Sequence, residues 1–425
     1  MTNFVCQRVR LKRPRYNQKN TDTMNTTKLR ANLRTVMGNL LTRIIIAILL
    51  GIALAYVLPL WAVRVFETFN AVFAQFLSFM IPLIILGFVA PAIADVGGRA
   101  GKMLIATVAL AYGATLFAGF GSFFVSDWIF PHIITAGTVS GGGDAVASID
   151  PYFTIQMPAL MPVTSALILA FLLGLGVAAL PDNTVFKGLL DQFRGIVQMV
   201  IERAILPLLP VFIFGIFLNM TVTGQVAHIM ATFAKIIVVI FAMHVAILLI
   251  QYGVAALFSR GSHNPFKLLG TMLPAYFTAL GTQSSAATIP VTLRQTVKMG
   301  VDENVASFTV PLCATIHMSG STLKIVACAV ALMLSSAMPY TLSMFAGFIC
   351  MLGITIIAAP GIPGGVIMAS LGVLSSMLGF NEADNALMIA LYVAMDSFGT
   401  ACNVTGDGAL SIIINRFFGK RPQDS

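Results

Sequence analysis

The stretch Ala358-Ala-Pro-Gly-Ile-Pro-Gly-Gly365 interrupts an apolar segment that extends over residues 341–378. A second apolar segment, residues 268–293, is interrupted by Gly281-Thr-Gln-Ser-Ser-Ala-Ala-Thr-Ile-Pro290. Proline and glycine break regular helix, and irregular backbone at membrane depth survives only where protein or a wet cavity satisfies its polar groups. The two broken segments therefore predict re-entrant hairpins that line a substrate site.

The composition places the rest of the chain in a lipid bilayer. Of the 425 residues, 58% are apolar and 10% are charged, and the mean hydropathy is +0.91. Soluble domains carry about 25% charged residues, so a soluble multidomain enzyme is excluded. Eight more segments have the roughly 20 apolar residues that a membrane-crossing helix needs. They are residues 40–61, 68–93, 101–126, 159–180, 195–220, 227–257, 304–334 and 384–415. We predict an all-α polytopic membrane protein with eight transmembrane helices and two re-entrant hairpins.

The basic residues predict how the chain lies in the membrane. Most of the net charge of +9 comes from a basic tail, residues 1–38, and an apolar span follows it directly. Few aromatic residues accompany these basic residues, so we expect a lipid surface and no nucleic acid as the partner. Other basic residues fall at those ends of the predicted spans that lie on the same side of the membrane as this tail. The positive-inside rule then places both termini, including residues 416–425, in the cytoplasm of a bacterial inner membrane.

The last apolar segment carries a stripe of polar side chains. Asp396, Thr400, Asn403 and Asp407 are separated by four, three and four residues. At about 100° per residue they share one face of a helix. A carboxylate at membrane depth is costly unless a cation or a set of hydrogen bonds compensates it. The stripe predicts a substrate and cation site, and pairing with neighbouring helices alone is the alternative.

The seventh span is also polar near its centre. Gly320 lies among hydroxyl residues, which predicts local unwinding, and His317, Ser321 and Lys324 have the spacing of one helix face. A lysine this far from the span ends is not explained by snorkelling to the membrane surface. We expect it to pair with Asp396 or with an anionic substrate.

Other classes of protein have weaker support. The chain has neither a GxSxG nor an HExxH motif, so enzymatic activity is not expected. An intramembrane hydrolase built from Ser285, His317 and Asp396 is one alternative. An ion channel is another, although two hairpins with different tips suit an occluding gate better than a symmetric filter.

Four ordered motifs resemble the dicarboxylate/amino acid:cation symporters, the glutamate-transporter superfamily. They are Ser284-Ser285 through Ile289-Pro-Val-Thr292, Pro311-Leu-Cys-Ala-Thr-Ile-His-Met318, Gly361-Ile-Pro-Gly364, and Asp396 with Asn403-Val-Thr-Gly-Asp407. The resemblance implies a homotrimer in which a transport domain moves like an elevator against a scaffold. The resemblance implies a scaffold formed by residues 39–93 and 159–220. It implies a transport domain formed by residues 101–126 and 227–415, with residues 127–158 as an exterior loop.

The resemblance also implies roles for individual residues. Asp396 corresponds to the carboxylate that holds the substrate amino group, and Thr400 and Asn403 to contacts with the amino-acid head. The two hairpin tips complete the substrate site with Ser284, Ser285, Gly361, Ile362, Pro363 and Gly364. Asp407, Asn403 and backbone near Cys313 and His317 correspond to one sodium site. Backbone of Thr315 and Met318, with the second hairpin, corresponds to another.

Two departures from the family pattern bear on the substrate. Members that carry acidic substrates have an arginine where this chain has Gly399, and some place one where it has Gln283. Without a guanidinium to bind a side-chain carboxylate in a bidentate manner, we expect a small neutral amino acid. The sequence around Asp396 is most similar to that of the serine/threonine branch.

The seventh helix departs as well, since the family's Asn-Met-Asp-Gly-Thr is His317-Met318-Ser319-Gly320-Ser321 here. The missing aspartate indicates fewer coupled sodium ions, and proton coupling through His317 is the alternative because imidazole titrates near neutral pH. Lys324 has two open roles. It neutralises Asp396 when the site is empty, or it replaces the missing arginine and binds an acidic amino acid or a C4 dicarboxylate.

Overall fold

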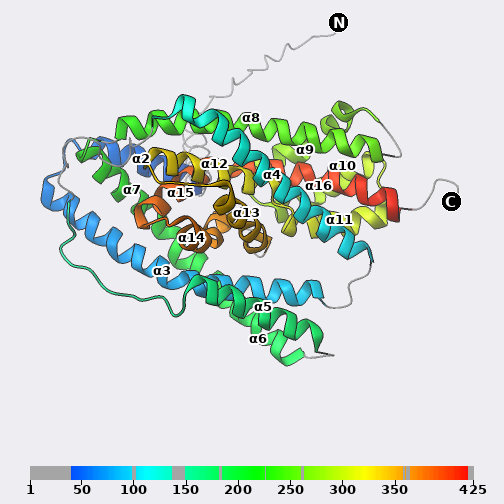
Figure 1. Ribbon diagram of the computed structural model, residues 1–425, viewed down its shortest axis with the longest axis horizontal. Coiled ribbons are helices and arrows are strands. Elements are labelled where there is room, and N and C mark those ends of the chain that lie inside the picture. Colours follow the sequence, from blue (N-terminus) through cyan, green and yellow to red (C-terminus); the bar gives the residue numbers. More distant parts are fainter. Residues whose placement is uncertain are drawn as a thin grey trace, which may run out of the picture.

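The structure, a computed structural model, describes residues 40–97, 102–135, 149–180, 184–224, 226–259, 263–357, 359 and 364–419. All regular secondary structure in these ranges is helical (Figure 1). The predicted basic tail, the middle of the predicted exterior loop and three residues of the second hairpin tip, Gly361, Ile362 and Pro363, lie outside the described residues.

One group of helices is arranged around the long helix α3. Its members are α2 (Leu40–Leu54), α3 (Leu60–Gly97), α5 (Val163–Ala179), α6 (Thr184–Val200), the π-helical turn η1 (Ile201–Ile205) and α7 (Leu206–Val222). Helix α3 packs against α5, α6 and α7, and α2 packs against α7. Gly174 allows α5 to pack closely on α3, because a Cβ there would come within 2.8 Å of the Ala90 carbonyl oxygen.

The other group surrounds the last helix. Its members are α4 (Lys102–Ile133), α8 (Val226–Phe258), α9 (Pro265–Thr282), α10 (Ser285–Lys298), α11 (Glu303–Ile316), α12 (Ser319–Ser335), α13 (Leu342–Ile357), α14 (Gly365–Leu378), α15 (Glu382–Ala394) and α16 (Asp396–Phe418). Helix α16 packs against α8, α9, α11 and α12, and α4 crosses α12 (Figure 1). Helix α4 continues to Ile133, past the predicted end at residue 126, since Trp128, Ile129 and Phe130 extend its apolar run.

Both interrupted segments form pairs of short helices that pack against each other, α9 with α10 and α13 with α14. The first pair turns at Gln283, whose backbone is left-handed with φ 54°, and the Ser284 side chain then caps α10 by accepting from the Ala287 N–H. The second pair resumes after Gly364, which has φ 75°. A positive φ is free of steric cost for glycine, so Gly364 suits this turn better than another residue would.

Two of the predicted spans are broken, and one break differs from our expectation. The last span bends by 61° between α15 and α16, directly before Asp396. The seventh span breaks at His317 and Met318, whereas we predicted unwinding at Gly320. Gly320 is helical, and its missing side chain serves close packing instead, because a Cβ there would lie 2.7 Å from the Gly399 carbonyl oxygen. His317 therefore does not share a helix face with Ser321 and Lys324.

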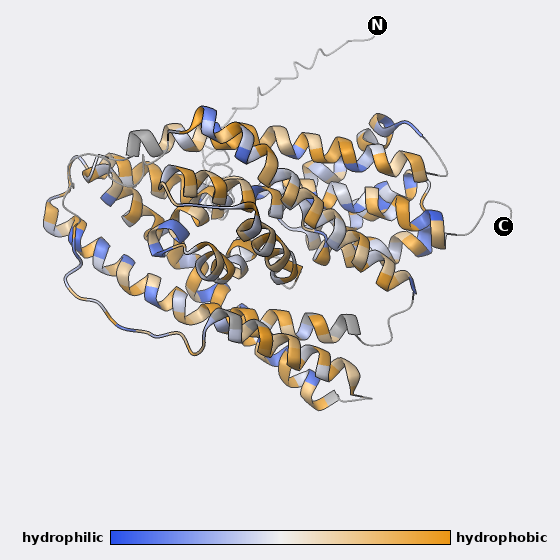
Figure 2. Cartoon of the chain, in the orientation of Figure 1, coloured by the Kyte–Doolittle hydropathy of each residue, from blue (hydrophilic) through white to orange (hydrophobic). Residues whose placement is uncertain are grey.

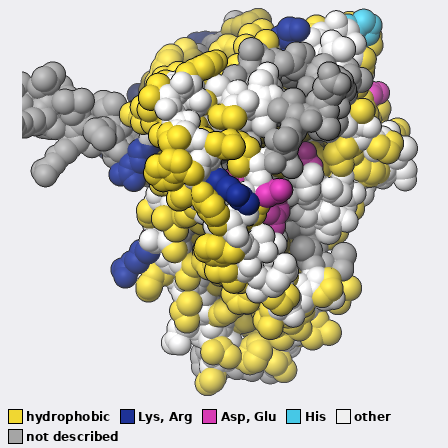
Figure 3. Space-filling model, turned by 90° about the vertical axis from the view of Figure 1, so that its left-hand side faces the viewer, with side chains coloured by type: hydrophobic (Ala, Val, Ile, Leu, Met, Phe, Trp, Pro, Cys, Tyr) yellow, Lys and Arg dark blue, Asp and Glu magenta, His cyan; other side chains and the backbone are white. Residues whose placement is uncertain are grey.

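The surface and the helix lengths are those of an integral membrane protein. Within the described residues, five helical segments are long and apolar enough to cross a bilayer, or six if the bent pair α15–α16 forms one span. Hydrophobic residues run along most of the helices (Figure 2). They also cover much of the face at the left-hand end of Figure 1, where few charged side chains are visible (Figure 3). Outward positions such as Val238 and Leu257 on α8 are 68% and 80% exposed, which is favourable only against lipid or protein.

Candidate functional site

Asp396 is the first residue of α16 and connects two other elements through its carboxylate. Its Oδ1 lies 3.0 Å from the Lys324 Nζ on α12, and its Oδ2 accepts a hydrogen bond of 2.8 Å from the Gly364 N–H, just before α14. Asp396 is 4% exposed and Lys324 is fully buried. The bend before α16 places the carboxylate there, where both oxygens have partners. The predicted pairing of Asp396 with Lys324 is thus present in the structure.

The ammonium group of Lys324 is enclosed by α15 and α16. Its Nζ lies 3.4 Å from the centroid of the Tyr392 ring and 3.4 Å from the Met395 carbonyl oxygen. A cation over an aromatic face is attracted by the ring quadrupole, and this attraction increases on desolvation. Gly399 makes room for the ammonium, because a Cβ there would lie 2.8 Å from Nζ and 2.9 Å from Cε. The position at which some family members have an arginine is therefore filled by the tip of Lys324.

The turn between α9 and α10 also contacts the start of α16. The Gln283 side chain donates a hydrogen bond of 2.8 Å from Nε2 to the Ser397 Oγ, next to Asp396. Ser285, in the first turn of α10, is buried. Gln283, at the turn between α9 and α10, and Gly364, directly before α14, thus both contact the start of α16. The sequence singled out Gln283 because some members of the resembling family have an arginine at this position, but it did not predict the hydrogen bond from Gln283 to Ser397.

About two turns further along α16, Asn403 binds the start of α12. Its Oδ1 accepts hydrogen bonds from the Gly320 N–H at 2.8 Å and the Ser321 N–H at 3.3 Å, and its Nδ2 donates to the Ser321 Oγ at 3.0 Å. The first N–H groups of a helix have no partner within the helix, so Asn403 satisfies donors that the break at His317 creates. Thr400 is buried on the same face of α16.

Asp407 closes the polar stripe at the break between α11 and α12. Its Oδ1 lies 2.9 Å from the His317 Nδ1, and the His317 Nε2 lies 2.6 Å from the Ser319 Oγ. Gln251 of α8 donates to the same serine hydroxyl at 3.1 Å. Cys313 is buried in the last turn of α11, whereas Thr315 is exposed and bonds to the Leu312 carbonyl. The Thr315 hydroxyl is thus engaged with the backbone of its own helix, which leaves the backbone of this residue as the part available to an ion site.

This geometry separates two polar centres along α16. Asp396 has a lysine ammonium and a backbone N–H as partners, and Asp407 has an imidazole. Hard cations are bound by carboxylate and carbonyl oxygens, and a broken helix offers carbonyl groups that helical bonds would otherwise use. Asp407 at the α11–α12 break thus offers a carboxylate next to backbone carbonyl groups, which are the donors that hard cations prefer. The hydrolase alternative would require His317 to contact Asp396, but His317 pairs with Asp407.

Two polar residues of α8 also belong to this region, and sequence reasoning missed both. The His244 Nε2 lies 3.0 Å from the Gly320 carbonyl oxygen, and Gln251 contacts His317 and Ser319. The signal was available, because these two polar side chains are seven residues apart, on one face of the apolar part of α8 that follows Lys235. They extend the polar centre from α12 and α16 to α8.

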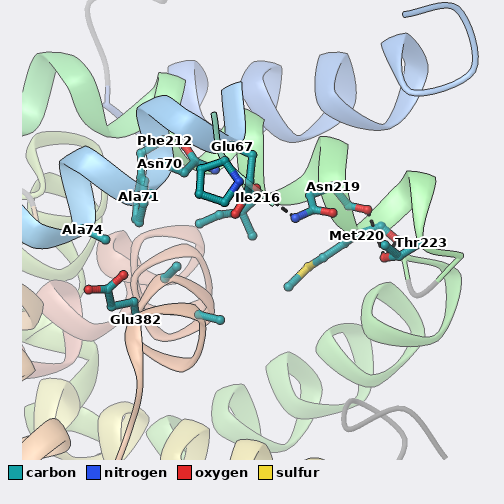
Figure 4. A pocket seen from close by; sticks show the side chains of 13 residues that line it. Glu67, Asn70, Ala71, Ala74, Phe212, Ile216, Asn219, Met220, Thr223 and Glu382 are labelled. Carbon is teal, nitrogen blue, oxygen red and sulfur yellow. Dashed lines mark hydrogen bonds between the residues drawn. The ribbon is translucent and has the colours of Figure 1, made fainter. Parts of the chain in front are cut away.

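A cavity of about 380 Å³ lies elsewhere, between α3, α7 and the start of α15 (Figure 4). The Glu67 Oε2 accepts a hydrogen bond of 2.9 Å from Asn219, which like Glu67 lines this cavity, and the Glu382 Oε1 accepts one of 3.1 Å from Gln75 of α3. None of the predicted site residues lines this cavity. It lies where the helices around α3 meet α15, and it is separate from the polar centre at Asp396.

Long apolar helices, paired helix breaks and buried carboxylates that face those breaks define an integral membrane transporter. The chain belongs to the sodium:dicarboxylate symporter family, whose model matches residues 40–417. The resemblance found in the four motifs is therefore confirmed.

Two relatives show how far this similarity extends. The serine/threonine transporter SstT of Acinetobacter baumannii (strain AYE) is 27% identical over 392 residues, which cover 87% of this chain and 94% of the relative. The excitatory amino acid transporter 4 of Mus musculus is 35% identical over 156 residues, which cover 36% of this chain and 27% of the relative. The expected similarity to the serine/threonine branch thus extends over most of the chain.

Proposed function

We propose that the chain is a secondary symporter that imports a small neutral amino acid, similar to serine or threonine, together with sodium. One observation carries the choice of substrate. Asp396 is buried where the two hairpin tips meet α16, and the next turn presents Gly399 in place of a guanidinium. A carboxylate suits a substrate ammonium group, and a small substrate needs no second clamp for its side chain.

In this proposal the amino-acid head lies along the first turns of α16. The substrate ammonium binds Asp396, Thr400 and Asn403 contact the head, and its carboxylate faces the tips of the hairpins. These tips contribute Ser284 and Ser285 from the first hairpin and Gly361, Ile362, Pro363 and Gly364 from the second. Support comes from the hydrogen bonds that already connect both tips to the start of α16.

The proposed sodium site includes Asp407, Asn403 and backbone near Cys313 and His317. A further site uses the backbone of Thr315 and Met318 together with the second hairpin. The break at His317 and Met318 supports both, because it leaves carbonyl groups of α11 outside the helical pattern. The bond from His317 to Asp407 supports proton coupling as the alternative, with the imidazole in place of one ion.

The proposed mechanism is an elevator in a homotrimer of the inner membrane, with both termini in the cytoplasm. Helices α2, α3, α5, α6 and α7 would form the scaffold, and α4 with α8 to α16 the moving domain. The way the helices pack supports this division, since α3 is the centre of one group and α16 the centre of the other. Eight transmembrane helices and two re-entrant hairpins complete this layout.

A second candidate is supported by the ammonium of Lys324 next to Asp396. In that case the chain would transport an acidic amino acid or a C4 dicarboxylate, with Lys324 as a point charge for the substrate carboxylate. The family description names dicarboxylates, and the mouse relative is an excitatory amino acid transporter. The two candidates differ in whether Lys324 attracts the substrate or competes with it.

A thermal-shift screen of the purified protein tests these proposals together. It would compare twenty amino acids and C4 dicarboxylates, with and without sodium, at two pH values. We expect serine or threonine to raise the melting temperature only when sodium is present. Stabilisation by succinate or aspartate alone would favour the second candidate, and a requirement for low pH without sodium would favour proton coupling. Saturable counterflow of labelled, chemically unchanged serine in liposomes would exclude a channel and an enzyme.

A further inference from the structure

Lys324 lies where a substrate ammonium group would have to bind. Its Nζ is 3.0 Å from the Asp396 Oδ1, and the other carboxylate oxygen is bound by the Gly364 N–H. An amino acid that binds through Asp396, as proposed above, must therefore displace Lys324 from this oxygen.

We propose that Lys324 is a tethered substitute for the substrate amino group, which neutralises Asp396 when the site is empty. This inference rests on the proposed function. The ammonium is bound to Oδ1 and the Gly364 N–H to Oδ2, so both carboxylate oxygens have a partner without substrate. A buried carboxylate without a cation is strongly unfavourable, and Lys324 removes this cost when no substrate is present.

The surroundings of Lys324 provide a second position for its ammonium when substrate arrives. The Tyr392 ring and the Met395 carbonyl each lie 3.4 Å from Nζ, and both remain available after the contact with Asp396 is broken. A short movement of the side chain is therefore enough to exchange one ammonium for another. Gly399 is required for this arrangement, because a side chain there would overlap the lysine tip.

The consequence concerns the transport cycle. A carrier accumulates substrate only if its empty form returns across the membrane, and exchange of one substrate molecule for another needs only the loaded form. With Lys324 on Asp396 the charge of this carboxylate is compensated in the empty form, so the empty form returns without a second substrate or cation carried outward. We expect net uptake to depend on Lys324 more strongly than exchange does.

The test uses Lys324→Met in the full-length protein, purified and reconstituted into liposomes. Removal of the competing ammonium should tighten serine binding about tenfold, equivalent to about 1.4 kcal/mol. The ratio of net uptake into serine-free vesicles to serine exchange should fall at least about tenfold. Lys267→Met, which removes an exposed lysine from α9, is the matched control and should change neither quantity.

Gly399→Ala tests the same contact if the lysine variant does not fold, since its methyl group would displace Nζ from Asp396. The ratio of uptake to exchange should fall in this variant too. Weaker serine binding by Lys324→Met, or an equal fall in uptake and exchange, would overturn the inference and make Lys324 a ligand of the substrate. Absence of serine exchange in the unsubstituted protein would instead overturn the proposed function.

Discussion

At the scale of single residues, the site is a set of buried ionisable groups, each with an ionisable or polar partner. Asp396 and Lys324 form one pair, and Asp407 and His317 form another. Removing one member of a buried pair typically costs about 3–5 kcal/mol, because the other charge is left without compensation. Removing both costs far less. The stability of single and double variants therefore reports whether each pair is ionised in the folded protein.

Asp396→Asn should lower the melting temperature in detergent, because the Lys324 ammonium loses its carboxylate. It should also abolish serine binding, because the substrate ammonium loses the same carboxylate. The double variant Asp396→Asn/Lys324→Met should recover most of the stability and none of the binding. A double-mutant cycle of melting temperatures, with binding measured in parallel, checks both statements. Additive losses of stability would contradict an ion pair between these residues.

Asp407→Asn should remove most of the stimulation of uptake by sodium, since an amide offers a cation no charge. Uptake by the variant should therefore change less with sodium concentration, from about 1 to 100 mM at constant ionic strength, than uptake by the unsubstituted protein. Asp191→Asn, at an exposed position of α6, is the control. An unchanged sodium dependence would exclude Asp407 from the ion site.

At the scale of helices, glycines set the distances between the elements that carry the site. Gly320 on α12 faces the Gly399 carbonyl and Cys402 of α16, and a Cβ there would lie 2.7 Å from both. Backbone cannot give way as a flexible side chain can. Gly320 therefore keeps α12 close enough for Lys324 to reach Asp396 and for Asn403 to bind the first N–H groups of α12.

Gly320→Ala should lower the melting temperature and weaken serine binding together. Overpacking of a tight contact typically costs about 1–3 kcal/mol, and any separation of α12 from α16 lengthens the bond from Lys324 to Asp396. Gly253→Ala on α8 is the matched control, because a Cβ there meets nothing within 4 Å. Equal effects of the two substitutions on serine binding would show that the distance between α12 and α16 does not control the site.

At the scale of the whole molecule, the elevator proposal makes a prediction about cross-links between the two groups of helices. Gln75 of α3 and Glu382 of α15 are joined by a hydrogen bond of 3.1 Å across the proposed sliding boundary. A cross-linked cysteine pair at these positions should stop uptake, and reduction should restore it. The experiment requires a background in which Cys6 and Cys350 are replaced by serine.

The control for this cross-link lies within the proposed scaffold. Glu67 of α3 and Asn219 of α7 are joined by a hydrogen bond of 2.9 Å, and a cross-link there should leave most uptake intact. Uptake that survives the pair at residues 75 and 382, with cross-linking verified by mass, would contradict the movement of α15 past α3.

The sequence by itself determined the membrane class, the paired helix breaks and the polar face of the last helix. Each depends on properties that adjacent residues share: apolar runs, the conformations of glycine and proline, and the spacing of Asp396, Asn403 and Asp407 on one helix. The unwinding at Gly320 was mispredicted for the same reason. Glycine in a polar stretch indicates flexibility, but here it serves the packing of α12 on α16.

Only the tertiary structure decided which partner each charged group takes. Lys324 and Asp396 are 72 residues apart, and His317 and Asp407 are 90 residues apart. The sequence left Lys324 a choice between Asp396 and an anionic substrate, and it did not predict that the His317 side chain bonds to Asp407. The pairing follows from where α12 crosses α16 and where the hairpins end, and such contacts between distant segments are set by packing rather than by local spacing. The tertiary structure also brought Gln251 and His244 of α8 to the same centre.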